Sequence, residues 1–356
     1  MPSRLLSAAL LLGTLAAIAV PGAEGREAST SAPESPASTV EAMGTGPASR
    51  WRPLAPSPLA RTEVTAASVR RSIYVIGGYT SGGAPTAAVE RYDTETGRWE
   101  LVAPMPVALN HAAAVSYRGQ LYVVGGYTGL PFSLGIGFGP VASASRGFYR
   151  YDPATNRWSK MPPAPTPRGG SAAAVYKDKL LLAGGADELQ PLRRFEIFDF
   201  RRNAWSTGPP MPLATEHTAG AVSQHGFYVI GGRPAYGRPN YTDVQKYRIR
   251  RDRWRRVAPL ARGRGGFAAA TVCGRPVAFG GEDPRSGPPG TIAEVERFFP
   301  RRRAWRPLPP MLTPRHGLGG ASVGRTIYAM EGGDVTFAAV TNVAESLRVP
   351  CRSQGH

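Results

Sequence analysis

The chain has 356 residues and a formal net charge of +18, from 43 Lys and Arg against 25 Asp and Glu. Almost all of the positive charge is arginine, because the only lysines are those at 160, 177, 179 and 246. Codon bias produces the same arginine excess, so the total charge alone does not identify a partner. A chain of this length would ordinarily contain two domains, but the internal repeats described below exclude that division and indicate one large domain.

The N-terminal segment has the features of an export signal. Arg4 precedes an apolar run from Leu5 to Val20, and Ala23-Glu24-Gly25 offers small residues at a cleavage site. This order predicts a secretory signal peptide over residues 1–25. The alternative is an uncleaved membrane anchor, although about 16 apolar residues are short for a bilayer span. We therefore expect a protein that is secreted or associated with the cell envelope, with no stable membrane span after processing.

Residues 26–50 are rich in Ser, Thr, Ala, Pro and Gly and show no hydrophobic periodicity. Such a composition cannot bury enough apolar surface to order the backbone. The sequence thus predicts a disordered linker between the signal peptide and the folded domain.

From residue 51 onward, one pattern of about 50 residues recurs along the chain. In its first full copy, hydrophobic and aromatic residues lead into Gly77 and Gly78, the run Val-Glu-Arg-Tyr-Asp follows at 89–93, and Trp99 closes the unit. The double glycines lie at 77/78, 125/126, 184/185, 231/232, 280/281 and 332/333, and the tryptophans lie at 51, 99, 158, 205, 254 and 305. This pattern resembles the kelch repeat, which implies that each copy is a four-stranded blade of a β-propeller.

The two ends of the repeat region complete one another. Residues 51–56 have the Trp of an outermost strand but no inner strands before them, whereas residues 316–348 supply three inner strands with no Trp after them. Joining them removes exposed sheet edges. We therefore predict an all-β fold, a six-bladed kelch propeller over residues 51–349 closed by the N-terminal strand completing the last blade, with a C-terminal tail over 350–356. The last blade departs from the pattern, because Glu331 stands where the first glycine of the pair is expected.

The chain has two cysteines. Cys273 is expected to end the innermost strand of blade 5, and Cys351 follows the third strand of blade 6, so both would lie toward the same face of adjacent blades. Two cysteines in an exported chain are more often paired than free, and a disulfide here would fix the C-terminal tail near the closure. The alternative is that Cys273 is simply a small core residue.

The loops of a four-stranded blade fall on two faces. We call "top" the face of the loops that enter the innermost strand and of those that join the second strand to the third, and "bottom" the opposite face. Aligning the repeats on the double glycine places four arginines at equivalent positions at the top mouth of the axis, and three of the five histidines fall beside them. We predict that this funnel, with a cationic core, binds the ligand through Arg61, Arg168, Arg264, Arg315, His111, His217 and His316.

A metal site at this mouth is disfavoured by the spacing of the histidines. They come from alternate blades, which is expected to distribute them around the axis, whereas zinc requires ligand atoms about 2.0–2.1 Å from one point. Copper-radical oxidases of the galactose oxidase type also have a kelch propeller, but they need a cysteine cross-linked to a metal-binding tyrosine, and neither Cys273 nor Cys351 is placed for that. We therefore predict no metal and no cofactor.

The sequence favours a secreted binding protein that recognises a carbohydrate or a protein ligand in the funnel. The alternative is catalysis, because secreted six-bladed bacterial kelch propellers include the sialic acid mutarotases, which this chain resembles in blade count and export signal. That resemblance implies opening and reclosing of a sugar ring by general acid and base. The candidate bases are Glu282, Glu216 and His217, and the candidate clamps for a substrate carboxylate are Arg168, Arg264 and Arg315.

Blade 2 carries an uncharged insertion after its glycine pair, TGLPFSLGIGFGPVASAS. Loops of this length are usually functional or disordered, and the apolar content of this one does not favour disorder. We therefore predict a lid or contact surface on the top face, with Phe132 and Phe138 as ligand-binding residues. The alternative is a plug that only covers the neighbouring blade.

Basic residues outnumber acidic ones in the bottom loops, which contain runs such as Arg201-Arg202, Arg250-Arg251 and Arg301-Arg302-Arg303. We predict that this face docks on a polyanionic cell-surface polymer, such as an anionic cell-wall polymer or an acidic polysaccharide, and that binding weakens at high salt. Nucleic acid is not expected as a partner of an exported protein. The alternative is a solvated face that only keeps the protein soluble.

Overall fold

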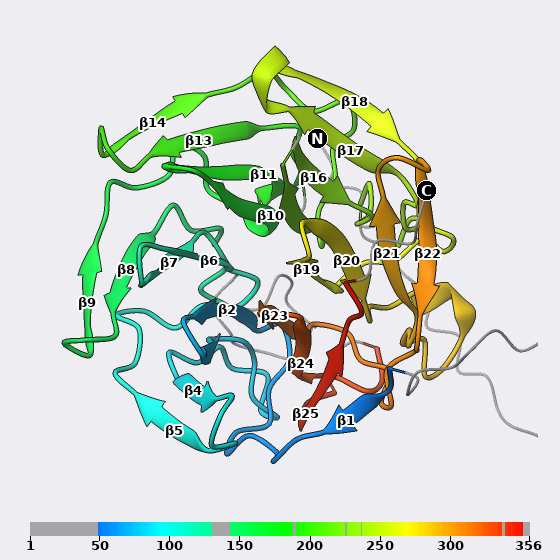
Figure 1. Ribbon diagram of the computed structural model, residues 1–356. Helices are drawn as coiled ribbons and strands as arrows, with labels where there is room; N and C mark the ends of the chain where they lie inside the picture. The colour runs from blue at the N-terminus through cyan, green and yellow to red at the C-terminus, as the bar shows by residue number, and fades with distance from the viewer. Residues whose placement is uncertain are drawn as a thin grey trace, which may run out of the picture. The chain divides into compact units, whose positions relative to one another are not determined.

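The computed structural model describes residues 49–129, 143–187, 190–224, 226–235, 237–336 and 339–351. In this part of the chain, 25 strands form six antiparallel sheets within the unit Ala48–His356 (Figure 1). The innermost strands of neighbouring sheets contact one another in a closed circuit. The prediction of an all-β six-bladed propeller is confirmed.

Each sheet is a meander of four strands, numbered along the chain. The innermost strands are β2 (Thr65–Val69), β6 (Ala113–Tyr117), β10 (Gly169–Tyr176), β15 (Ala219–Ser223), β19 (Ala268–Val272) and β23 (Gly319–Val323). The second strands are β3 (Ser72–Ile76), β7 (Gln120–Val124), β11 (Lys179–Asp187), β16 (Gly226–Ile230), β20 (Arg275–Phe279) and β24 (Thr326–Gly332). The third strands are β4 (Val89–Asp93), β8 (Phe148–Asp152), β13 (Phe195–Asp199), β17 (Val244–Arg248), β21 (Val295–Phe299) and β25 (Thr341–Arg348). The outermost strands are β5 (Trp99–Val102), β9 (Arg157–Lys160), β14 (Ala204–Thr207), β18 (Arg253–Val257), β22 (Ala304–Leu308) and β1 (Trp51–Pro53). Blade 3 has an additional short strand, β12 (Gln190–Pro191), which pairs with β11. Two 3-10 turns, η1 (Ile249–Arg251) and η2 (Pro284–Ser286), lie between strands.

The innermost strands are built from small residues because the axis is crowded. A Cβ atom on Gly220 of β15 would lie 2.7 Å from the carbonyl oxygen of Ala173 in β10, and one on Gly319 of β23 would lie 2.9 Å from Cβ of Ala66 in β2. Larger apolar residues of the second and third strands fill the widening space between blades, as Val75, Leu182 and Phe279 do with no exposed surface. The hydrophobic core is therefore divided into layers between neighbouring sheets.

Each tryptophan joins its blade to the preceding one. Nε1 of Trp158 donates a hydrogen bond to the carbonyl of Ala103, just after the outermost strand of blade 1, at 2.8 Å. The same bond forms in every blade, and Trp51 completes the circuit by donating to Pro309 at 2.9 Å. The Trp period thus reflects a contact between blades as well as burial of the rings.

The ends of the propeller meet in one sheet, as predicted. Strand β1 pairs with β25, with Trp51 opposite Leu347 and Pro53 opposite Glu345. Trp51 is only 3% exposed, because its ring packs in the layer between blades 5 and 6. Cys273 and Cys351 form a disulfide, with Cα atoms 5.8 Å apart, that links the β19–β20 turn to the residues after β25. The closure is therefore made both by backbone pairing and by a covalent bond.

Several sequence predictions concern residues that lie outside the described ones. These are the signal peptide at 1–25, most of the linker at 26–50, Phe132 and Phe138 of the blade 2 insertion, and most of the tail at 350–356. Among the residues that are described, no helix has the length and apolar composition needed to cross a bilayer.

Candidate functional site

The four arginines predicted to line the funnel are buried inside the blades, so that prediction is wrong. None of the four has exposed surface. In each, Nη1 donates to the carbonyl of the first residue of the glycine-pair position. It also donates to a second carbonyl, just before the third strand in blades 1, 3 and 5 and near the start of that strand, at Val343, in blade 6. Nη2 also reaches a glutamate of the third strand, in the pairs Arg61–Glu90 (2.5 Å), Arg168–Glu196 (2.7 Å), Arg264–Glu296 (2.8 Å) and Arg315–Glu345 (2.6 Å).

The remaining two blades show that these ion pairs are structural. In all six blades the residue at the arginine position accepts a hydrogen bond, through its backbone carbonyl, from the second residue of the preceding glycine-pair position. In blade 2 this residue is Leu109, and Tyr149 replaces the glutamate; in blade 4 it is Thr215, and Gln245 replaces the glutamate. Arginine and glutamate therefore occur together or not at all, as expected for a buried pair in which an unpartnered charge would be costly.

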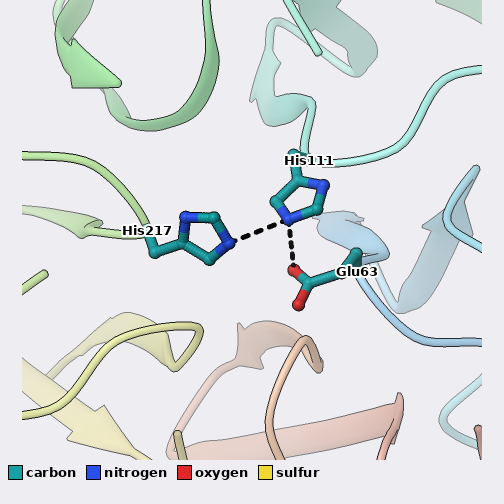
Figure 2. A group of neighbouring side chains, drawn as sticks. All are labelled: Glu63, His111 and His217. Carbon is teal, nitrogen blue, oxygen red and sulfur yellow. Dashed lines mark hydrogen bonds and ion pairs between the residues drawn. The ribbon is translucent and has the colours of Figure 1, made fainter. Parts of the chain in front are cut away.

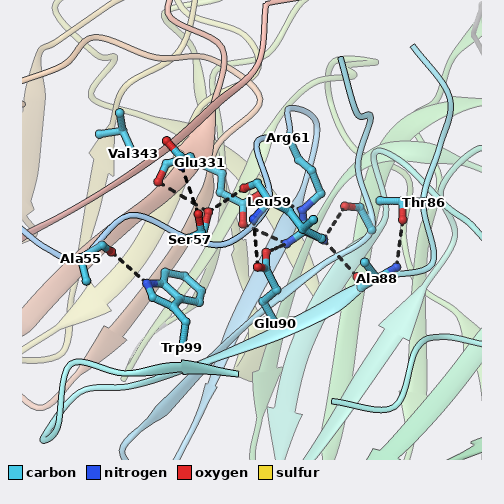
Figure 3. Close-up of polar contacts among 12 residues, drawn as sticks. Ala55, Ser57, Leu59, Arg61, Thr86, Ala88, Glu90, Trp99, Glu331 and Val343 are labelled. Carbon is cyan, nitrogen blue, oxygen red and sulfur yellow. Dashed lines mark hydrogen bonds and ion pairs between the residues drawn. The ribbon is translucent and has the colours of Figure 1, made fainter. Parts of the chain in front are cut away.

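Arg61 also binds a second carboxylate, which joins the first and last blades (Figure 3). Nε and Nη2 of Arg61 lie 2.9 Å from the two carboxylate oxygens of Glu331. Burial raises the pKa of Glu331 to about 8, opposed by Arg61 and reinforced by Glu90. The departure of blade 6 from the glycine pattern thus adds a contact across the closure.

Two residues after each arginine position, the backbone of all six blades forms a ring around the axis. These residues have φ between 49° and 62°, in the left-handed region that favours glycine. Successive blades are hydrogen-bonded here, as in His111 N to Glu63 O (3.0 Å) and Gly170 N to His111 O (2.8 Å). Three blades use glycine at this position, whereas the other three carry side chains that the backbone does not require: Glu63, His111 and His217.

These three side chains meet at one point (Figure 2). Nε2 of His111 lies 2.9 Å from Nε2 of His217 and 3.2 Å from Oε2 of Glu63. Nδ1 of His111 lies 2.6 Å from Oδ1 of Asn110, and Nδ1 of His217 contacts a carboxylate oxygen of Glu216. The expectation that alternate blades would keep these histidines apart is wrong, because blade 3 has only Gly170 between them.

A second set of side chains closes a polar circuit around the mouth. Nδ1 of His316 lies 3.4 Å from Glu63 Oε1 and 3.6 Å from Glu282 Oε2. Arg233 then bridges Glu282 (3.2 Å) and Glu216 (2.5 Å), and Glu216 contacts His217. The seven side chains of this circuit come from blades 1, 2, 4, 5 and 6, and we call it the axial ring. The candidate bases Glu216, Glu282 and His217 all belong to it.

The axial ring lies at the mouth of a narrow channel. The cavity along the innermost strands has a volume of about 130 Å³ and is lined by small residues such as Ala113, Ser171 and Gly220. Sites for small organic ligands usually exceed about 300 Å³, so the channel itself does not admit a sugar. With three carboxylates and one guanidinium in the ring, the mouth is rich in acid, and the prediction of a cationic core is wrong.

Comparison with known proteins identifies the repeat. A model of the KLHDC2/KLHL20/DRC7 kelch-repeats domain matches residues 42–209 and 113–333. The chain belongs to the kelch-repeat family. Kelch-like protein terF of Aspergillus terreus is 29% identical over 215 residues, which are 58% of this chain and 47% of terF. Kelch-like ECH-associated protein 1B of Danio rerio is 30% identical over 107 residues, which are 30% of this chain and 17% of that protein.

The matched regions span less than half of either curated relative. A solved structure of YjhT superposes with a TM-score of 0.67 at 16% identity, over 82% of this chain and 95% of YjhT. At that identity the likeness concerns the fold, and it agrees with the arrangement of the kelch blades described above.

Burial and charge act in opposite directions on the axial ring of this kelch propeller. Burial alone would raise the pKa of Glu63, but His111 and the other histidines outweigh it and hold that pKa well below its usual range. Burial would likewise raise the pKa of Glu216, but His217 and Arg233 outweigh it and lower that pKa to about 2. Burial lowers the pKa of His111 to about 4, despite Glu63. At His316 burial is outweighed by Glu63 and Glu282, and the pKa is raised. At neutral pH the ring therefore combines ionised Glu63 and Glu216 with a neutral His111.

The positions of two side chains within the kelch repeat were not recognised from the sequence. Arg233 follows the glycine pair of blade 4 as Glu282 follows that of blade 5, so its position in the repeat was the signal that could have placed it in the axial ring. His316 does not occupy the same position as His111; it stands one residue earlier in the repeat, at the position of Asn110 and Glu216. The funnel residues must therefore be assigned from two consecutive positions of the repeat.

Proposed function

We propose that this kelch propeller binds a carbohydrate on its axis at the top face, through the axial ring. The observation that carries the proposal is the convergence of side chains from five blades at the mouth, where three blades show that glycine satisfies the backbone. Buried ionisable side chains gathered at a concave site are characteristic of binding and catalytic sites. The fold gains nothing from Glu63, His111 and His217 that the three glycines do not already provide.

The composition of the ring indicates the kind of sugar. Carboxylates accept hydrogen bonds from sugar hydroxyls, while Arg233 and the imidazoles donate them. An acidic sugar was favoured only by the four arginines, which are buried, so the acid-rich ring favours a neutral sugar. The channel is too narrow for a sugar ring, and the ligand would therefore rest above it. The disulfide supports the proposal that the protein is exported, because such bonds persist in oxidising compartments.

A glycan array followed by titration tests this function. We expect binding of a neutral glycan, and we expect Glu282→Gln to weaken it about 10- to 100-fold, because a hydrogen bond to a charged group is lost. Glu95→Gln, the same change at an exposed bottom-face carboxylate, is the matched control and should bind as the parent does. Equal affinity of the parent and Glu282→Gln would remove Glu282 from the site. Capture of a protein, with no glycan bound, would assign the mouth to a protein ligand instead.

Mutarotase or isomerase chemistry is the second candidate, and one contact favours it. Glu216 engages Nδ1 of His217 and is itself held by Arg233, which orients the imidazole as general bases are oriented in enzymes. The clamp proposed for the substrate carboxylate is not available, because Arg168, Arg264 and Arg315 are buried. Anomer exchange followed by NMR on any sugar that binds separates this candidate from simple binding.

We further propose that the bottom face docks on an acidic polysaccharide or another anionic polymer of the cell surface. Two grooves of about 330 and 250 Å³ lie beside blade 4 and share Lys246 and Arg255. Their lining includes no carboxylate among the described residues, but it includes Lys246, Arg248, Arg250, Arg251, Arg255, Arg256 and Arg303. Lys246 is only 8% exposed, and within the described part of the chain its ammonium group has an aromatic neighbour, Tyr228, and no carboxylate partner. Such a site attracts anions.

Charge reversal distinguishes binding in the two grooves from attraction by the net charge of the whole protein. Arg250→Glu, Arg251→Glu and Arg255→Glu together should abolish low-salt retention on isolated cell envelopes. The control variant reverses Arg70, Arg98 and Arg157 on blades 1 and 2, which changes the net charge by the same amount, and it should keep most of the retention. Raising the salt concentration should release the parent protein. Equal losses in the two variants would show that only the total charge matters, and no loss in either would leave the face without a partner.

A further inference from the structure

The two imidazoles at the centre of the axial ring face one another through their Nε2 atoms. Asn110 is oriented by two hydrogen bonds from its amide nitrogen to backbone carbonyls, so its Oδ1 accepts from Nδ1 of His111. The carboxylate of Glu216 likewise accepts from Nδ1 of His217. When an imidazole carries its proton on Nδ1, its Nε2 is the atom that can bind a metal ion. The two Nε2 atoms are 2.9 Å apart.

Glu63 adds a third acceptor to the same point. Its Oε2 lies 3.2 Å from Nε2 of His111, and the ligand atoms of Glu63, His111 and His217 all lie within 4.8 Å of one another. With metal–ligand bonds of about 2.0–2.1 Å, neighbouring ligand atoms lie about 2.8–3.0 Å apart in octahedral and about 3.3–3.4 Å apart in tetrahedral coordination. The spacing on the two edges through His111 is therefore close to that of a coordination sphere, and two imidazoles with one carboxylate form a ligand set that zinc accepts.

We propose that Glu63, His111 and His217 bind one zinc ion at the top mouth of the propeller axis. This replaces the expectation, drawn from the sequence, that the mouth has no metal. The proposal does not depend on the sugar ligand proposed above. An ion held by three protein ligands keeps open coordination positions. The site is accessible to solvent, since the side chains of Glu63 and His217 are 13% and 12% exposed.

The surroundings of the three ligands are those of a metal site. Metal-binding histidines usually donate their other ring N–H to a carboxylate or an amide oxygen, which fixes the ring and its tautomer. Asn110 and Glu216 do this here, and Arg233 in turn holds Glu216. The second oxygen of Glu63 faces His316. The backbone ring fixes the three Cα positions, so the site is organised before an ion enters it.

Calorimetric titration with zinc chloride tests the site on the full chain after dialysis against a chelator. We expect one equivalent to bind and to raise the melting temperature, because the ion binds the folded state. His217→Ala should weaken binding by more than about 100-fold, and Asn110→Ala, which removes only an outer contact, by about 10- to 100-fold. His316→Ala removes an outer contact of the ligand Glu63, so it should keep the stoichiometry and weaken binding less than His217→Ala does. Glu95→Gln, at an exposed bottom-face carboxylate, is the control and should bind zinc as the parent does.

The visible absorption of the parent protein loaded with cobalt(II) is a second measurement that does not require a variant to fold. Bands typical of nitrogen and oxygen ligation are expected, and zinc should abolish them by displacement. Absence of saturable zinc binding, or equal affinity in the parent and His217→Ala, would overturn the proposal. Loss of binding in His316→Ala but not in His217→Ala would overturn the ligand assignment. Glycan binding by a protein that binds no zinc would leave the proposed function intact and remove only the metal.

Discussion

A variant that begins at residue 57 should lose more than about 5 kcal/mol of folding free energy, which is comparable to the whole stability of many domains. The deletion removes β1, exposes the backbone edge of β25 and empties the space occupied by Trp51. Truncation of a buried Trp alone costs about 3–5 kcal/mol. Denaturant unfolding followed by circular dichroism measures the change.

A variant that begins at Arg50 is the control for this deletion, because it removes the N-terminal segment and keeps β1. Its unfolding midpoint should match that of the parent. Trp51→Ala should fall between the two, since it keeps the strand pairing and loses the ring and its hydrogen bond to Pro309. If the residue-57 variant melted within a degree or two of the parent, closure of the ring by β1 would contribute nothing to stability.

Arg264→Thr is expected to destabilise the propeller by about 3–5 kcal/mol, because it leaves Glu296 buried without its charge partner. Glu296 is 5% exposed and lies 2.8 Å from the guanidinium, which also satisfies the carbonyls of Gly280 and Glu294. The effect should appear in the unfolding free energy and not in a ligand titration, which separates this arginine from a residue of the funnel.

Blade 4 suggests a second substitution that should restore stability to this variant. Blade 4 has Thr215 and Gln245 where blade 5 has Arg264 and Glu296. Adding Glu296→Gln to Arg264→Thr should therefore recover a large part of the lost stability, because no unpaired charge remains. A double variant as unstable as the sum of the two single variants would show that the two side chains do not act as a pair.

The blade pattern was predictable because its signals have strict physical causes. A Cβ on Gly77 would lie 2.2 Å from the carbonyl oxygen of Leu109 in the next blade, so every blade needs a very small residue or a compensating change there. Glu331 is such a change, with its carboxylate bound to Arg61. The six tryptophans recur because each donates a hydrogen bond to the blade before it.

The site was less predictable because position along the chain does not state where a long side chain points. The arginines do stand at equivalent positions near the mouth, but each turns back into its blade toward the glutamate of the third strand. That glutamate recurs only where the arginine does, as in Glu196 with Arg168, and this pairing was visible in the sequence. The approach of His111 to His217 was not, since it depends on Gly170 leaving the space between them open.

The circuit of tryptophan hydrogen bonds has a consequence for how the molecule comes apart. A linear array of repeats has two terminal units, each with a single neighbour, and it frays from those ends. Here every blade has two neighbours, and the bond from Trp51 to Pro309 removes both ends. No blade can detach without breaking two interfaces at once. Loss of one blade therefore releases its neighbours as well, and the propeller should unfold in one cooperative step.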